Sequence, residues 1–155
     1  MISFLICVFH EEKNIQETVE TIYKAIDKTN LKDVYQIVII NDGGDDFTEK
    51  TIHQLQLSDR NISYYKNKKS LGYGKSVKLG LTKIKHSKFM IVPGDNDMSS
   101  DTLIAALKHI NSADLIMVFP INIDSRSKIR NIILVLFRLI YLIFFDCYVN
   151  YINSP

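Results

Sequence analysis

The stretch Phe89-Met90-Ile91-Val92-Pro93-Gly94-Asp95-Asn96-Asp97 decides the fold, because an apolar run ends there in two carboxylates one residue apart. An apolar run of this length predicts a buried strand. A short loop at its carboxyl end would hold Asp95 and Asp97 at the rim of a sheet, where open α/β folds bind ligands. Two adjacent carboxylates repel unless a cation lies between them. Mg²⁺ takes one or two protein carboxylates and completes its shell with phosphate oxygens. A solvated acidic turn is the alternative for an isolated D-x-D.

The composition describes one domain of 155 residues, long enough to bury a core. With 19 basic and 17 acidic residues, the chain lacks the strong positive charge of a nucleic-acid-binding domain. Cys7 and Cys147 lie in apolar segments near opposite ends, which favours a reducing compartment over a disulfide framework. The first residues carry no basic leader and no small-residue cleavage site, so they predict a first strand. We expect a cytoplasmic protein.

Strand and helix patterns alternate along the chain. The predicted strands are Ile2–Phe9, Tyr35–Ile40, Ile62–Lys66, Phe89–Val92 and Asp114–Phe119. The predicted helices are Glu11–Lys28, Thr48–Leu57, Ser76–Lys85 and Ser100–Asn111. This alternation predicts an α/β fold with a mostly parallel sheet, right-handed crossovers and flanking helices.

The composition changes in residues 124–155. Arg126, Lys128 and Arg130 precede the apolar segment Ile132–Phe145, which is interrupted only by Arg138. A transmembrane helix needs about 20 apolar residues with few charges, so this segment is not expected to span a membrane. Two interpretations stay open: a helix buried by the domain, or a helix in a membrane interface with its basic residues at head-group level.

Polar loops follow the carboxyl ends of the first four predicted strands. These loops are Phe9–Glu12, Asn41–Asp46, Ser70–Lys75 and Asp95–Asp97. A parallel sheet brings such loops to one rim, which predicts a shared nucleotide pocket.

The order of these motifs resembles family 2 glycosyltransferases of the GT-A fold, nearest the dolichyl-phosphate mannosyltransferase-like branch. The resemblance runs from Ile2 to about Pro155. The matching motifs are Cys7-Val-Phe-His-Glu-Glu12 for P-x-Y-N-E-E, Ile39-Ile-Asn-Asp-Gly-Gly-Asp-Asp-Phe-Thr48 for V-V-D-D-G-S-x-D-x-T, Leu71-Gly-Tyr-Gly-Lys-Ser76 for N-x-G-x-G-x-A, and Pro93-Gly-Asp-Asn-Asp97 for the metal-binding D-x-D. Arg126 and Arg130 resemble the basic pair that this branch carries before its interfacial helices.

The resemblance implies a nucleotide-sugar-binding domain over residues 1–123. Residues 124–155 are expected to form a basic, apolar helical segment of a shortened domain, for which burial and a membrane interface both stay open. On the nucleotide, the implied roles are Phe9 on the base, Glu11 near the ribose, Asp42 as acceptor for the base N–H, and Asp95 with Asn96 on the ribose side. Asp95 and Asp97 would bind Mg²⁺ or Mn²⁺, with Asp97 as the direct ligand. Arg126 and Arg130 would bind an acceptor or donor phosphate.

The implied activity is metal-dependent, inverting transfer of a hexose from a UDP- or GDP-sugar. The implied acceptor is a polyprenyl phosphate or a membrane-associated glycan, reached at the cytoplasmic face of a membrane. The chain departs from the family pattern at Cys7, His10 and Asn41, which stand for proline, asparagine and aspartate. Ser99 stands where lipid-phosphate enzymes often carry glutamine, which leaves the acceptor open.

Two other functions remain open from the sequence. A truncated, non-catalytic nucleotide-binding or membrane-associated module fits the short C-terminal part. A phosphatase of the aspartyl-phosphate class fits Asp95-Asn-Asp-Met-Ser99, which matches D-x-D-x-[ST] with Asp95 as the nucleophile.

Overall fold

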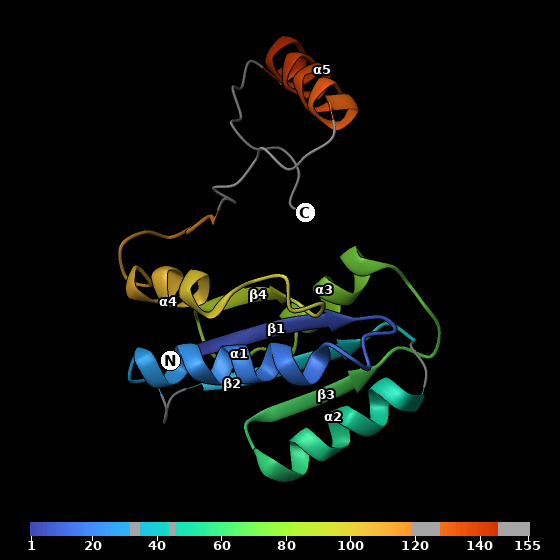
Figure 1. The fold of residues 1–155 in the computed structure, drawn as a ribbon, viewed down its shortest axis with the longest axis vertical. Coiled ribbons are helices and arrows are strands. Elements are labelled where there is room, and N and C mark those ends of the chain that lie inside the picture. The colour runs from blue at the N-terminus through green and yellow to red at the C-terminus, as the bar shows by residue number, and fades with distance from the viewer. Residues whose placement is uncertain (32–34, 44–45, 119–127, 146–155) are drawn as a thin grey trace. The chain divides into compact units, whose positions relative to one another are not determined.

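The structure is a computed structural model that describes residues 1–31, 35–43, 46–118 and 128–145. The chain divides into two compact units, Met1–Ile116 and Met117–Pro155. Strands and helices alternate through the first unit (Figure 1). Its elements are β1 (Ile2–Val8), α1 (Ile15–Lys28), β2 (Tyr35–Asn41), α2 (Asp46–Ser58), β3 (Ile62–Lys66), α3 (Tyr73–Leu81), β4 (Phe89–Pro93) and α4 (Ser100–Lys108).

The four strands form one parallel sheet in the order β3-β2-β1-β4. Strand β1 lies between β2 and β4, with Ile2 opposite Tyr35 and Ser3 opposite Phe89. The chain adds β2 and β3 on one side of β1 and then crosses to add β4 on the other. This reversal makes the carboxyl ends of β1 and β4 the topological switch point of the sheet, where open α/β sheets bind ligands. The predicted parallel α/β architecture is confirmed.

Helices cover both faces of the sheet. Because side chains alternate along a strand, Phe4 and Ile6 of β1 face one way and Leu5 faces the other. Phe4 and Ile6 pack in the core with residues of α1, α2 and α4, while Leu5 packs with residues of α3. The helical spacing from Ile15 to Ile26 places one buried stripe of α1 on the sheet. Among the described elements, α3 alone therefore covers the second face.

The predicted fifth strand is wrong where the structure describes it. Residues 114–118 form no strand, and Leu115 and Met117 are exposed. A strand forms only when its backbone groups pair with a neighbouring strand. No described strand runs alongside this segment, and residue 119 lies outside the described residues.

Several predicted boundaries also shift. Helix α1 begins at Ile15 and not at Glu11, because the Glu11 carbonyl accepts the N–H groups of Asn14 and Ile15 in a turn (3.1 and 3.0 Å). Helix α3 begins at Tyr73, where Gly72 with φ 89° turns the chain into the helix. Helices α3 and α4 end at Leu81 and Lys108, before the predicted ends. Strand β4 was predicted as buried, but it pairs only with β1 among the described strands and exposes Phe89.

The second unit contains helix α5 (Lys128–Phe145). Apolar side chains are exposed along its described part. Within the described residues, none of the helices combines the length and apolarity that crossing a bilayer demands. The domain boundary expected at 123/124 falls in residues that the structure does not describe, and it stays a prediction.

Candidate active site

The loops that follow β1, β2 and β4 start at the same level of the sheet. Val8 pairs with Asn41, and Cys7 pairs with Pro93. The N–H of Asp42 donates to the Val8 carbonyl at 2.9 Å, which extends the ladder by one bond. The loops that carry Phe9, Asp42 and Asp95 therefore meet at one edge of the sheet, as the sequence predicts.

Asp42 fastens the loop between β3 and α3. Its Oδ1 accepts hydrogen bonds from Asn67 Nδ2 (2.7 Å), Ser76 Oγ (2.7 Å) and the Leu71 N–H (3.0 Å). Its Oδ2 accepts from Ser70 Oγ (2.9 Å) and the Gly72 N–H (2.9 Å). The residue is only 6% exposed. One carboxylate thus holds both ends and the middle of the glycine-bearing loop.

These hydrogen bonds decide the charge of Asp42. Burial alone would raise its pKa, but the donors from Leu71, Asn67, Ser76 and Ser70 lower the pKa well below its usual range. A carboxylate offers about four lone-pair sites, and five protein donors already use them. A base N–H could bind Asp42 only by displacing one of these donors.

Gly43 lets the β2 and β3 loops approach closely. It has φ 82°, and a Cβ at this position would lie 2.7 Å from the Lys69 carbonyl carbon and from the Ser70 nitrogen. Both neighbours are backbone atoms that cannot rotate away. Glycine is therefore required here by conformation and by space.

Helix α1 holds the loop that carries the aspartate pair. Thr18 Oγ1 donates to the Gly94 carbonyl at 3.1 Å. Asn96 adopts φ 59°, its Oδ1 accepts from Thr21 Oγ1 at 3.0 Å, and its Nδ2 donates to Glu17 Oε2 at 3.2 Å. The side chain predicted to bind the donor is thus used to anchor the loop to α1.

The aspartate pair fits a hard divalent cation. Asp95 and Asp97 are both exposed, and one oxygen of Asp95 accepts the Asp97 N–H at 3.2 Å. In the described part of the chain, no three His, Cys, Asp or Glu side chains gather to hold an ion. Mg²⁺ commonly takes one or two carboxylates and shares substrate phosphates, which matches this sparse set of ligands.

The opening loop presents an aromatic ring and a carboxylate. Phe9 is 48% exposed, and its ring packs edge-on against His10 with centroids 4.2 Å apart. His10 has φ 58°, which turns the chain sharply after β1. Glu11 accepts a hydrogen bond from Asn14 Nδ2 at 2.8 Å. The exposed face of Phe9 can stack on a planar base.

Cys7 and Tyr73 also belong to this edge, although the sequence assigned a role in the site to neither. Burial, and then the charge of Asp42, raise the pKa of Cys7 to about 11. Partial burial, and then the charges of Cys7 and Asp95, raise the pKa of Tyr73. Tyr73 begins α3 directly after Gly72, so its position in the glycine motif is the feature of the sequence that could have identified it as a site residue. The Asp95 charge acts on the Tyr73 phenol, so the start of α3 and the aspartate loop lie at the same edge of the sheet.

Glu12 adds an unsatisfied acceptor to the opening loop. Its Oε2 is buried and has no hydrogen-bond donor among the described residues. The two predicted arginines cannot be placed here. Arg126 lies outside the described residues, and Arg130 lies in α5 with its side chain outside them.

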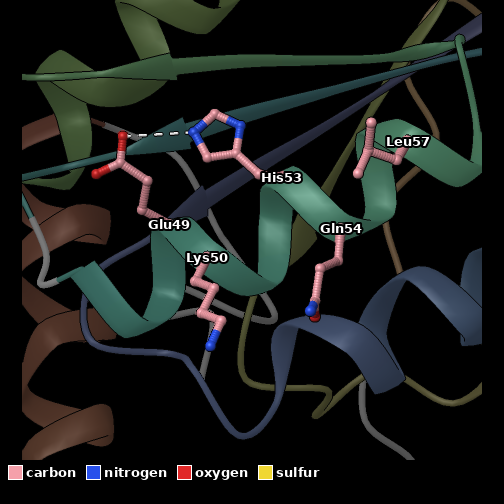
Figure 2. A pocket seen from close by; sticks show the side chains of 5 residues that line it. All are labelled: Glu49, Lys50, His53, Gln54 and Leu57. Atoms are coloured by element: carbon pink, nitrogen blue, oxygen red, sulfur yellow. Dashed lines mark ion pairs between the residues drawn. The ribbon is translucent and has the colours of Figure 1, made fainter.

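A separate hollow of about 440 Å³ lies along α2 (Figure 2). Glu49, Lys50, His53, Gln54 and Leu57 line it. Glu49 is engaged by His53 at 3.6 Å and by Lys66 at 2.5 Å, and the Lys66 contact lowers its pKa. These charges satisfy one another, and none of the converging loops contributes to the hollow. We therefore do not assign the active site to it.

Comparison with known proteins defines the family. The family model described as glycosyl transferase family 2 matches residues 3–148. The chain belongs to glycosyl transferase family 2. The family 2 chain is also 30% identical, over 81 residues, to an uncharacterized glycosyltransferase of Haemophilus influenzae, a match covering 52% of this chain and 24% of that protein.

Solved glycosyltransferase structures share the fold. The mannosyltransferase PcManGT from Pyrobaculum calidifontis, in complex with GDP-Man and Mn²⁺, aligns with a TM-score of 0.59 and 15% identity over 69% of this chain and 31% of its own. S. aureus TarS 1–349, in complex with UDP-GlcNAc, aligns with a TM-score of 0.61 and 20% identity over 82% and 37%. The expected GT-A-like fold is confirmed. This chain spans about a quarter to two fifths of the length of these proteins.

Proposed function

We propose that this family 2 domain takes part in metal-dependent, inverting transfer of a hexose from a UDP- or GDP-sugar. The observation that carries the proposal is the exposed Asp95/Asp97 pair in the loop after β4, at the edge where β1, β2 and β4 end. Phe9 and the Asp42-held loop lie at the same edge. The GDP-Man and Mn²⁺ in the PcManGT structure and the UDP-GlcNAc in the TarS structure support nucleotide-sugar donors in this fold.

The chain's own residues bind and orient the donor. Phe9 stacks on the base, and Glu11 lies near the ribose. Asp42 acts on the base side, either by shaping the loop that closes this pocket or by exchanging one loop donor for a base N–H. Asp95 takes the ribose side, while Asn96 keeps the loop anchored to α1.

Asp97, with Asp95, is proposed to hold Mg²⁺ or Mn²⁺. When bound, the cation neutralises charge that develops on the departing nucleotide diphosphate. Asp97 suits this role because no described side chain donates a hydrogen bond to its carboxylate, so its oxygens stay available. Asp95 uses one oxygen to cap the turn and keeps the other.

The acceptor is proposed to be a polyprenyl phosphate or a membrane-associated glycan. Its oxygen attacks the anomeric carbon opposite the diphosphate, so one C–O bond forms as the other breaks and the configuration inverts. A phosphate acceptor is already an anion and needs no protein base. Arg126 and Arg130 are proposed to hold an acceptor or donor phosphate, since guanidinium groups match phosphate geometry. Helix α5 is proposed to attach this region to the cytoplasmic face of a membrane.

The second candidate is a nucleotide-binding module without turnover of its own, which the sequence leaves open. Family membership leaves the phosphatase interpretation of Asp95 without support. Turnover of a labelled nucleotide sugar in the presence of membrane extract separates the transferase from the binding module.

The metal site is tested by titrating UDP and GDP in calorimetry with and without Mn²⁺. We expect binding that requires the metal and a loss of at least about tenfold in affinity for Asp97→Ala, since one of at most two protein ligands is removed. Asp101→Ala, an exposed aspartate in the first turn of α4, is the matched control. Nucleotide binding of equal affinity with and without Mn²⁺, or an Asp97→Ala variant with the affinity of the wild type, would refute the proposal.

A further inference from the structure

Positive charge is concentrated in one segment of this nearly neutral chain. Residues 60–94 contain nine of the 19 basic residues and neither aspartate nor glutamate. All 17 acidic residues lie outside it. The segment includes the two edge strands of the described sheet, β3 and β4, and helix α3, which packs on β1 and β2 between them.

Several of these basic residues are already engaged. Lys66 pairs with Glu49 at 2.5 Å, Lys83 lies over the Tyr65 ring at 4.9 Å, and Lys88 donates to the Ile110 carbonyl at 2.7 Å. The other six basic residues of the segment are exposed and form no ion pair with a carboxylate of the described residues. Four of these six lie between the end of β3 and the end of α3; they are Lys68, Lys69, Lys75 and Lys78, which we call the α3 lysine patch.

The α3 lysine patch lies along the loop and the helix that come directly after β3. Lys68 and Lys69 begin the loop that Asp42 fastens, and Lys75 and Lys78 lie one turn apart on the outer side of α3. The inner side of α3 is marked by Ser76 and Gly80, which are buried. The opposite face of the sheet is covered by α1, α2 and α4, which carry acidic residues.

We propose that the α3 lysine patch docks the domain on an anionic lipid surface. A molecule with one basic face and acidic residues behind it is oriented by an extended planar anion. Lysines suit such a surface because their long stems reach head groups without a fixed geometry. Leu71 and Leu81, 41% and 38% exposed, border the lysines and supply apolar contacts at the same surface.

A nucleic acid is the competing polyanion. Recognition of single strands commonly uses arginine and aromatic stacking platforms beside the charge. The segment 60–94 contains one arginine, Arg60, which precedes β3 at the end opposite the loop. One exposed ring, Tyr73, lies among the patch lysines, and an aromatic ring with a polar tip also suits the head-group region of a bilayer. The scarcity of arginine favours a lipid surface, and the test includes an oligonucleotide.

The test measures binding of the full chain to phosphatidylcholine vesicles with and without phosphatidylglycerol. The patch variant carries Lys68→Gln, Lys69→Gln, Lys75→Gln and Lys78→Gln. The matched control carries the same change at four exposed lysines elsewhere, Lys13, Lys24, Lys28 and Lys50. Binding to the neutral vesicles reports apolar contacts such as those of α5, and the part of the phosphatidylglycerol increment that the patch variant loses reports the patch. Thermal unfolding of both variants shows that they are folded.

Each lysine near an anionic surface strengthens binding about fivefold. We expect the patch variant to lose at least roughly twentyfold of the phosphatidylglycerol-dependent binding, and the control less than about threefold. Salt of about 1 M, with a Debye length of about 3 Å, should remove the same increment from the wild type. Equal losses in the two variants, or no increment at all, overturn the proposal. Tighter patch-dependent binding to an oligonucleotide than to the anionic vesicles also overturns it. Mn²⁺-dependent nucleotide binding is measured separately, so either idea can fail alone.

Discussion

Asp42 makes the largest single contribution to the shape of the site edge, because five donors meet on its carboxylate. Asp42→Asn replaces one acceptor oxygen with a donor group that faces hydrogen-bond donors. We expect the variant to lose about 1–3 kcal/mol of unfolding free energy, since buried hydrogen bonds to a charged group are disrupted. Urea denaturation at neutral pH measures this loss, with the exposed Asp114→Asn as control.

The same residue gives a dependence on pH. Its folded pKa is lowered from 3.8, so the unfolded chain binds its proton more readily than the folded one. The contribution of Asp42 is therefore fully present above about pH 5 and declines as the pH falls below the unfolded value. We expect the difference in unfolding free energy between the wild type and Asp42→Asn to become smaller as the pH is lowered from about 5 to about 2. A difference that stays constant over this range would contradict the mechanism.

Thr21 is expected to position the loop that carries Asp95 and Asp97, although it contacts neither the nucleotide nor the metal itself. It donates to Asn96 Oδ1, and Asn96 separates Asp95 from Asp97. Thr21→Val removes this donor at similar volume, which frees a loop held at φ 59°. We expect Mn²⁺-dependent nucleotide affinity to fall about fivefold, the equivalent of one hydrogen bond near 1 kcal/mol. Thr21→Ser keeps the donor and should restore most of the affinity in calorimetry. A Thr21→Ser variant as weak as Thr21→Val would exclude this role for the hydroxyl.

Sequence position and side-chain direction were predictable to different degrees. The positions of Asp42, Asp95 and Asp97 at strand ends follow from local pattern, and the structure places them at one edge. The direction of Asn96 does not follow, because its partners are some 75 residues away on α1. The five donors to Asp42 could not be predicted either, because they lie in a segment that only folding brings close to Asp42.

At the scale of elements, α3 depends on close approach to the sheet. A Cβ on Gly80 would lie 2.2 Å from Leu5 Cδ1, and Leu5 is fully buried. Gly80→Ala should therefore destabilise the protein by about 1–3 kcal/mol through overpacking. Gly74 is in the same helix with nothing near its Cβ position, so Gly74→Ala should be neutral or stabilising by up to about 1 kcal/mol. Thermal unfolding of the two variants separates packing from helix propensity. The reverse order of stability would show that α3 does not pack as described.

Periodicity predicted the elements whose packing is settled locally. The stripe of α1 and the apolar runs of β1 and β2 were correctly predicted, because each buries a pattern readable within one segment. The strand expected at 114–118 failed, because strand formation also needs a neighbour that the pattern cannot supply. The exposure of Phe89 has the same origin, since β4 lies at the edge of the described sheet.

At the scale of the whole molecule, the sequence leaves two interpretations of α5 open: burial against protein or a position in a membrane interface. Substitutions at its exposed apolar side chains distinguish the two. Phe144 and Phe145, 76% and 67% exposed, offer large apolar surfaces near the end of the helix. Burying one such side chain is worth about 1.5–3 kcal/mol, or more than about tenfold in partition. If α5 lies in a membrane interface, Phe144→Ser and Phe145→Ser should each reduce flotation with neutral vesicles by about that factor. Leu57→Ser, at an exposed position of α2, should leave flotation unchanged. If α5 is instead buried against protein, the two variants should lower the unfolding temperature, and wild-type flotation should be absent.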